Sequence, residues 1–418
     1  MKSWKIIIGG LVLVLCGSLT QAAIVVPGAD GSDGALLVAE NTVIDLSLAT
    51  TGEWDDAGTG DGVYDSNKWA VVFKYSSVVV SNGVTVSFAN HPSRAPVVWL
   101  VSGDVTIDGS VNLNGQSYQT APVHAEPGPG GFRGGVGTYS SGAYSSPGFG
   151  VGGGQQSGTT GTAGSYGTAG GSGPSAYGNQ SLLPLIGGSG GGGDDDYSGG
   201  GGAGGGALLI ASMQSVSVDG SVVANGGAGR NAGYPNNDQT GGGSGGGIRI
   251  VCDTLEGAGV LEVEGGYGYL TGGLGRTRLE RVVNANTIDV NAEATLSLLT
   301  LQPGATAMVW PPSNAPTAKI ISIGGGAAPG DPLVSFGTHG ADVVVTQTNT
   351  VQVVVETSNV ETSSVVVVRS TPRFNQAYST ANATVAEVVT PDPLVVRWVA
   401  DLPVGSGYGA MQVRVIRP

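Results

Sequence analysis

The sequence has few residues of the kinds that most catalytic and nucleic-acid-binding surfaces use. Charged residues make up 11% of the 418 positions and aromatic residues 6%, with only three histidines. These histidines, His91, His124 and His339, stand far apart and show none of the spacings of a zinc site. Basic residues number 17 against 31 acidic ones. This balance argues against nucleic acid and anionic membrane as partners.

The sequence has one long apolar run, and it lies at the N-terminus. Residues 6–15 follow two lysines and are too few to span a bilayer. Thr-Gln-Ala before Ala23 suits signal cleavage, so residues 1–22 are predicted to be a secretory signal peptide. The mature chain would then be extracellular, at the cell surface or periplasmic, without a transmembrane segment. Cleavage also removes Cys16, whose preceding leucine disfavours lipid attachment, and leaves Cys252 as the only cysteine, which we expect to be a small buried residue.

Glycine is the abundant residue, with 76 copies, but no strict Gly-X-Y period is present, which excludes collagen. A short motif recurs instead. Residues 105–115 read VTIDGSVNLNG, residues 216–226 read VSVDGSVVANG, and residues 255–265 form a looser copy. Alternate apolar residues in each copy share one face of a strand, and Asp-Gly marks a turn between two strands.

A glycine run and an apolar strand precede the later copies. Residues 201–206 lead into Ala-Leu-Leu-Ile, and residues 242–247 lead into Ile-Arg-Ile-Val. Recurrence of such a block predicts a stacked solenoid in which each copy buries its apolar face against the next. The alternative is a set of Asp-Gly hairpins in a sandwich.

Residues 125 to 206 form the most glycine-rich part of the chain. Ordering each glycine costs about 1–2 kcal/mol of backbone entropy. We interpret this stretch as a long insertion between two turns of the solenoid, partly ordered by scattered tyrosines and phenylalanines. Packed extended glycine chains that bond to one another are an alternative that the sequence leaves open.

The C-terminal part changes to β-branched runs separated by turn residues about every ten positions, which suggests an all-β sandwich of about 100 residues. The run at 365–368 would be prone to aggregation if exposed, and Arg369 has the character of a gatekeeper. The predicted strands are residues 319–323, 343–345, 351–355, 365–368, 384–389, 395–399 and 411–416.

Several of these motifs resemble those of secreted bacterial glycine-rich parallel β-helix proteins of the pectin-lyase-like fold. The motifs lie at residues 90–99, 127–132, 225–227, 241–250 and 275–280. The resemblance implies an all-β chain with a short right-handed parallel β-helix, an N-terminal cap and the glycine-rich insertion in residues 23–312. An Ig-like β-sandwich would follow in residues 313–418. That group has no settled activity, so no catalytic residue is implied.

One column of charged residues is a candidate ligand site. Alignment of the second and third glycine-led strands places Arg249 beside Arg278, with Leu208 in the preceding copy. Neighbouring strands lie about 4.8 Å apart, so the two arginines would repel unless acids lie near. Glu262, Glu264 and Glu280 are outward by alternation and could neutralise them. The column is then either a mutually paired, solvated face or a site for an acidic glycan.

Aspartates crowd the N-terminal segment, where Asp55, Asp56, Asp61 and Asp65 are candidate calcium ligands. The stretch 56–62 resembles a calcium loop only in part, because the closing glutamate is missing. Calcium is the one cofactor that the composition suggests.

No catalytic constellation is present in the sequence, and the repeated aspartates Asp108 and Asp219 both sit in Asp-Gly turns. We therefore expect a secreted structural or adhesive surface protein without catalytic activity, whose partners are extracellular polysaccharide or other surface proteins. One alternative is a polysaccharide lyase or glycoside hydrolase that uses Arg249, Arg278 and nearby acids. Another is a carbohydrate-binding module, which would bind glycans without turnover.

Overall fold

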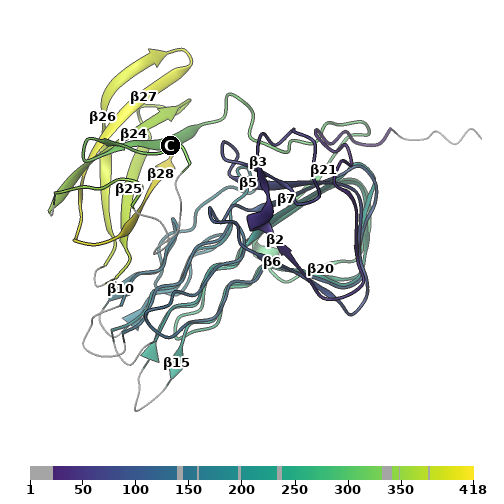
Figure 1. The fold of residues 1–418 in the computed structure, drawn as a ribbon, viewed down its shortest axis with the longest axis horizontal. Helices are drawn as coiled ribbons and strands as arrows, with labels where there is room; N and C mark the ends of the chain where they lie inside the picture. The colour runs from purple at the N-terminus through teal and green to yellow at the C-terminus, as the bar shows by residue number, and fades with distance from the viewer. Residues whose placement is uncertain are drawn as a thin grey trace, which may run out of the picture.

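The computed structural model describes residues 22–138, 145–157, 160–195, 199–232, 238–331, 341–347, 349–374 and 377–418. The predicted signal peptide therefore lies almost wholly outside the described residues, and so does His339. Within the described ranges the chain is all-β, with two short 3-10 helices and no α-helix. Parallel strands occupy one end of the molecule, an antiparallel sheet occupies the other, and glycine-rich segments run between them (Figure 1).

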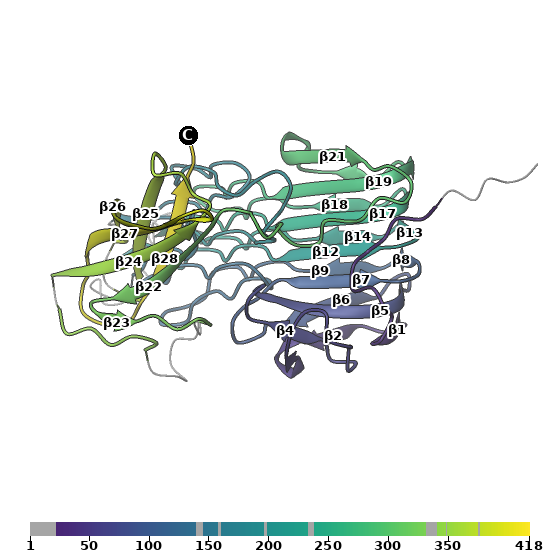
Figure 2. The ribbon, with the colours of Figure 1, turned by 90° about the horizontal axis from the view of Figure 1, so that it is seen from above.

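Over the described residues the larger sheet has eleven strands, which pair in parallel except where β4 (Val63–Asp65) meets β5 (Ala70–Val80), and its main ladder follows the glycine-led blocks of the sequence. Each strand pairs in parallel with the matching strand of the next copy, so the strands stack one above another (Figure 2). The ladder consists of β5 (Ala70–Val80), β7 (Val97–Val101), β12 (Ala207–Ser212), β17 (Gly247–Gly257), β19 (Arg276–Asn286) and β21 (Leu296–Thr300).

The repeated Asp-Gly motif links this sheet to a second one of six strands. β8 (Val105–Ile107) pairs in parallel with β5 and β13 (Ser215–Val218). β9 (Ser110–Asn112) pairs with β6 (Thr85–Ala89) and β14 (Ser221–Val223). Asp108-Gly109 is thus a corner between two sheets, and the hairpin alternative is wrong. The copies align in register, because Val105 pairs with Val216, and Val216 pairs with Leu255.

The six-stranded sheet runs β2-β6-β9-β14-β18-β20. The remaining strands of the two sheets are β1 (Gly34–Val38), β2 (Thr42–Asp45), β3 (Thr50–Thr51), β4 (Val63–Asp65), β6 (Thr85–Ala89), β13 (Ser215–Val218), β14 (Ser221–Val223), β18 (Val260–Glu262) and β20 (Asp289–Val290). The 3-10 helix η1 (Leu46–Leu48) places the fully buried Leu46 in the core near the first strands, and η2 (Glu293–Thr295) precedes β21. We call the two sheets together the strand stack.

The strand stack has apolar side chains on both faces of its larger sheet. Inward residues such as Ile107, Ile210 and Ile250 pack against the six-stranded sheet in one continuous core. Outward residues of the same strands form a second cluster, which is covered by Ile24, Val26, Tyr166, Tyr177, Leu182 and Val309. Along β7, β12 and the first half of β17 the larger sheet is therefore buried on both faces, as the uninterrupted apolar runs there require.

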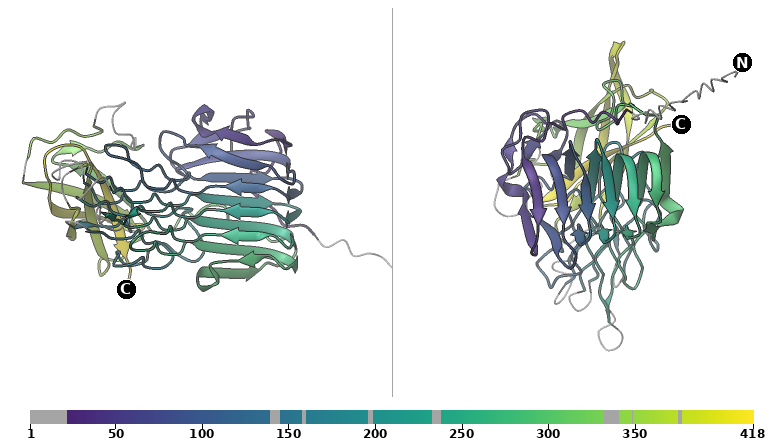
Figure 3. Two further views of the ribbon diagram at one scale, coloured as in Figure 1. Left: turned by 90° about the horizontal axis from the view of Figure 1, so that it is seen from below. Right: turned by 90° about the vertical axis from the view of Figure 1, so that its right-hand side faces the viewer.

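The glycine-rich segments form an ordered array of extended passes that hydrogen-bond to one another, which we call the glycine array. It comprises the described residues of 114–138, 145–155, 162–173, 186–195, 199–206, 224–230, 240–247 and 263–275. Figure 3 shows these passes running alongside one another from the strand stack toward the C-terminal sheet. Four short strands pair near the far ends of the passes: β10 (Gln156–Ser157), β11 (Thr160–Gly161), β15 (Asn231–Ala232) and β16 (Asp238–Gln239).

Hydrogen bonds within the array repeat every third residue. The amides of Gly188, Gly191 and Asp194 donate to the carbonyls of one neighbouring pass, at Gly205, Gly202 and Gly199, over 2.8, 2.8 and 3.1 Å. The carbonyls of the same three residues accept from Phe132, Gly135 and Thr138 in another pass. Three residues per turn without internal hydrogen bonds is the geometry of the polyproline II helix.

This arrangement resolves the choice that the sequence left open for residues 125–206. The glycines are packed chains that bond to one another, and aromatic residues such as Phe149 and Tyr166 are buried beside them. Glycine is required because passes approach one another closely. A Cβ on Gly191 would lie 2.0 Å from the carbonyl oxygen of Gly241.

Over its described residues the C-terminal region is a seven-stranded antiparallel sheet that curls so that β22 (Thr317–Ile323) and β28 (Gly409–Ile416) come into contact. Its core contains Val353, Val366, Val368 and Trp398. Six of the seven predicted runs are strands, but residues 343–345 form none. The strands are β22 (Thr317–Ile323), β23 (Gly326–Ala327), β24 (Thr350–Ser358), β25 (Val365–Pro372), β26 (Ser379–Pro391), β27 (Leu394–Pro403) and β28 (Gly409–Ile416).

The C-terminal sheet is joined to the glycine array by buried polar and aromatic contacts. Arg369 is 6% exposed and donates to the carbonyls of Gly148 and Gly153 over 3.0 and 3.1 Å. Burial lowers the pKa of its guanidinium to about 10. His124 of the array stacks on Phe374 of the C-terminal region, with ring centroids 5.8 Å apart. Arg369 is thus an anchor between the two regions, a role that the gatekeeper interpretation does not include.

Replacement of Gly191 by alanine is expected to destabilise the protein. The added methyl group must displace a backbone carbonyl that is itself part of the array, a form of overpacking that costs about 1–3 kcal/mol or more. Thermal unfolding followed by circular dichroism would measure this as a lower melting temperature. Gly330→Ala is the control, because no atom lies within 4 Å of its Cβ position. Equal melting temperatures for both variants would contradict close packing in the array.

Stability is expected to fall on acidification because of His124. The residue is 7% exposed, and burial lowers its pKa from 6.5 to about 4, with Arg94 and Arg373 adding to the effect. Between these two values the unfolded chain binds a proton that the folded chain does not, so folding becomes less favourable as the pH falls. The loss approaches about 3 kcal/mol near pH 4.

The measurement is the free energy of unfolding of the wild type and of His124→Asn between pH 7 and pH 4. The asparagine cannot titrate, so subtracting its curve removes the contribution of carboxylates that protonate in the same range. A constant difference between the two curves would contradict the assigned pKa shift.

Candidate functional site

The two predicted arginines do lie side by side in the larger sheet. Arg249 of β17 pairs in register with Arg278 of β19, and Leu209, rather than Leu208, occupies the matching position of β12. Leu208 instead pairs with Ile248 and faces the core. The alignment differs by one residue because the glycine run before β12 ends at Gly206, whereas the run before β17 continues to Gly247. Gly247 pairs with Ala207.

Glu280 neutralises this arginine pair, as the sequence suggested. Its Oε1 accepts from Nε of Arg249 at 2.9 Å and from Nε of Arg278 at 3.2 Å. The guanidinium of Arg249 also donates to the carbonyl of Met308 at 2.8 Å. Arg249 is only 1% exposed, and burial lowers its pKa, while Glu280 acts in the opposite direction. Arg249 is therefore enclosed and cannot meet a polymer in solution.

Glu262 and Glu264 lie elsewhere, on the side of the six-stranded sheet. Glu262 ends β18, and its Oε2 accepts from Nδ2 of Asn225 at 2.8 Å. The backbone amide of Glu264 donates to Oδ1 of the same asparagine at 2.7 Å. The chain turns a corner between β17 and β18. Outward side chains of β17, such as Arg249, therefore point away from the larger sheet, whereas those of β18, such as Glu262, point away from the six-stranded sheet. The four predicted ligand residues are therefore not brought together.

The N-terminal aspartates are held mainly by backbone amides. Asp65 is buried, and its two carboxylate oxygens accept from the amides of Asn67, Lys68 and Trp54. Oδ2 of Asp56 accepts from the amide of Glu53 at 2.9 Å. The side chains of Asp55 and Asp61 are exposed. Within the described ranges, no group of three or more histidine, cysteine, aspartate or glutamate side chains could hold a metal ion. A calcium site at these residues stays a prediction.

A buried lysine also sits among these acids. Lys74 is fully buried, and its Nζ donates to the carbonyl of Asp56 and lies 3.8 Å from Oδ2 of Asp30. Its backbone amide donates to Oδ2 of Asp33 at 2.6 Å. The positive charge that the local acids require therefore comes at least in part from the chain itself.

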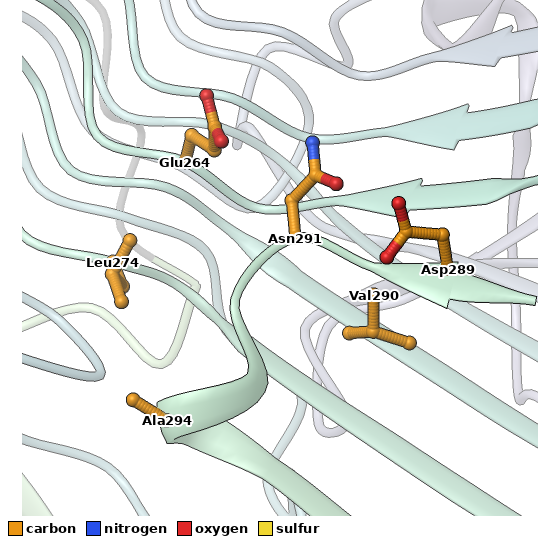
Figure 4. A pocket seen from close by; sticks show the side chains of 6 residues that line it. All are labelled: Glu264, Leu274, Asp289, Val290, Asn291 and Ala294. Carbon is orange, nitrogen blue, oxygen red and sulfur yellow. The ribbon is translucent and has the colours of Figure 1, made fainter.

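The sequence did not predict a hollow where the strand stack ends. It has a volume of about 510 Å³ and lies between the glycine pass that follows β18 and the last strand of the six-stranded sheet. Figure 4 shows the carboxylates of Glu264 and Asp289 and the amide of Asn291 along it, with Leu274 and Val290 beside them. Asp289 follows Ser110, Ser221 and Val260 in register, so comparison of the copies could have placed it beside β18.

A second hollow, of about 20 Å³, is large enough only for a water molecule. Beside it, Glu126 bridges Arg94 and Arg133 over 2.8 and 2.7 Å. Burial raises the pKa of Glu126, and Arg94 opposes that shift. These three charges fasten the first long glycine pass to the loop before β7, which is a structural role.

Cys252 is fully buried in the core of the strand stack, and burial raises its pKa. The thiolate is the reactive form of cysteine, so this thiol is chemically inert. The prediction of a small buried residue is confirmed.

Comparisons with protein-family models, curated proteins and solved structures returned no match for this chain. Among the described residues no helix is long and apolar enough to cross a membrane.

Glu280→Gln is expected to destabilise the protein strongly. Two neighbouring guanidinium groups, one of them fully enclosed, would lose the negative charge between them, and breaking a buried ion pair costs about 3–5 kcal/mol. Chemical denaturation would report the loss. Glu356→Gln, which removes a partly exposed acid paired with the exposed Arg397, is the control and should change stability by less than about 1 kcal/mol. Similar losses for both variants would argue against a special role for Glu280.

Proposed function

We propose that this chain is a secreted structural or adhesive protein without catalytic activity. In this proposal the strand stack is a short right-handed parallel β-helix and the C-terminal sheet is an Ig-like β-sandwich, as in the group that the sequence resembles. The parallel ladder with in-register copies supports the first assignment. The antiparallel sheet, curled around one core, supports the second.

The observation that carries the proposal is the glycine array. It is a thick body of backbone with few side chains, and its amides and carbonyls bond between passes. Such a body offers little side-chain chemistry, but it joins the strand stack to the C-terminal sheet through the buried Arg369. A rigid spacer that presents two surfaces suits a structural or adhesive role better than a catalytic one.

The positions of the charged residues also favour this role. A lyase that acts on polyuronates needs a basic residue at its binding surface, and the arginines that could have served are held by Glu280. The residues lining the hollow at the end of the stack include two acids and an amide but no base. The lyase form of the enzyme alternative therefore has no residue in the lining of the hollow that would hold an acidic glycan.

Secretion and absence of turnover can be tested together. The full chain is expressed in a bacterium with its own N-terminus, and the exported protein is analysed by mass spectrometry. We expect a mature chain that begins at Ala23. Incubation with polygalacturonate, alginate and neutral glycans should release neither unsaturated sugar nor new reducing ends. Retention of the chain in the cytoplasm, or release of sugar that depends on the protein, would overturn the proposal.

A further inference from the structure

We propose that the hollow at the end of the strand stack, together with the tyrosine-bearing pass beside it, binds an uncharged polysaccharide. This inference rests on the adhesive role proposed above and names the class of ligand. Its site is the surface formed by Glu264, Tyr267, Leu274, Asp289 and Asn291, which we call the end groove.

The shape and chemistry of the end groove suit a sugar ring. Its lining joins apolar groups, Leu274 and Val290, to hydrogen-bonding groups on Glu264, Asp289 and Asn291 (Figure 4). Sugars have apolar C–H faces and a rim of hydroxyls, so they need apolar contact on one side and donors and acceptors at the edges. Carboxylates and an amide together supply both acceptors and donors. The hollow is shallow and open to solvent, so a polymer can lie across it without entering an enclosed cavity.

Exposed aromatic side chains continue from the hollow along the same glycine pass. Tyr267 is 68% exposed and Tyr269 is 49% exposed, only a few residues beyond Glu264. Burying such rings on an adjacent partner is favourable, and a tyrosine offers both an apolar face and a hydroxyl. A chain of several sugar units could therefore extend from the hollow onto this pass.

The end groove is held in place by the backbone around it. The amide of Glu264 donates to Asn225 at 2.7 Å, and the carbonyl of Glu264 accepts from the amide of Gly226 at 2.9 Å. The carbonyl of Tyr267 accepts from the amide of Gly229 at 2.8 Å. Asp289 lies in β20, which pairs in register with β18. Preorganisation of this kind lowers the entropic cost of binding.

Charge selects among glycans. The residues that line the hollow carry two negative charges and none that is positive, and Glu262 lies on the neighbouring strand. Uronic acid and sulfated polymers would be repelled at this surface. The charges thus point to a neutral glycan, in contrast to the acidic glycan that the arginine column alone suggested.

The test is affinity electrophoresis of the mature full chain in gels that contain soluble xylan, mannan, mixed-linkage glucan or galactan, with polygalacturonate and alginate for comparison. We expect at least one neutral polymer to retard the protein and the two polyuronates to leave it unretarded. Glu264→Gln with Asp289→Asn should weaken binding about tenfold, the effect of losing about 1.4 kcal/mol of hydrogen bonding to charged acceptors. Tyr267→Ala should weaken it as well.

The control is Glu40→Gln with Glu256→Gln, which removes the same charge from exposed positions that do not line the hollow. It should bind like the wild type, and melting temperatures confirm that every variant is folded. The inference is overturned if no neutral polymer retards the wild type, if a polyuronate binds equally well, or if the end-groove variants bind like the wild type.

These results separate the inference from the proposed function. If the end groove binds no neutral polymer, but the chain is exported and releases no sugar, the structural or adhesive role still stands. Cleavage of a bound neutral glycan would instead refute the non-catalytic role while supporting the end groove as the binding site.

Discussion

The structure depends on backbone hydrogen bonds between glycine passes. Adjacent residues of one pass turn toward different neighbours, so that Gly190, Gly191 and Gly192 donate to three separate passes. At the glycine positions that face a neighbouring pass, contacts of this density leave no room for a Cβ, so glycine is required there. The larger parallel sheet is continuous with this body, since β12 and β17 both begin where a glycine pass ends.

The entropy of glycine explains why the array is several layers thick. Fixing each residue costs about 1–2 kcal/mol, and one net hydrogen bond contributes about 1 kcal/mol, so a single pass on a surface would not stay ordered. In a pass that is surrounded by other passes, both the amide and the carbonyl groups find hydrogen-bond partners, and the backbone also makes close van der Waals contacts along its length. The central pass around Gly191, with neighbours on several sides, is where this condition is met best.

The sequence predicted the strand copies well, because alternation and Asp-Gly corners are local signals. It placed Arg249 beside Arg278 for the same reason. It could not show that Arg249 is covered, because the chain that covers it, near Met308, has no periodic pattern. It also could not separate the two outward directions of a stack with corners, so Glu262 and Glu264 were grouped with the arginines. The sequence left the structure of the glycine passes undecided, because a run of one residue type has no hydrophobic periodicity.

The end groove lies where repetition stops, and there is a physical reason for this. Within a stack, each copy covers the one before it, so side chains at matching positions are constrained to small or mutually compatible groups such as Ser110 and Ser221, whose hydroxyls lie 3.0 Å apart. Among the described strands none pairs with β20 on its far side. Asp289, which follows Val260 in register, and the hollow beside it are therefore not constrained by a further copy. A repetitive scaffold is therefore free to evolve a specific binding surface mainly at its ends and in the segments that leave the stack. The end groove combines the two, because Asp289 lies in the last strand of the six-stranded sheet and Tyr267 lies on a glycine pass.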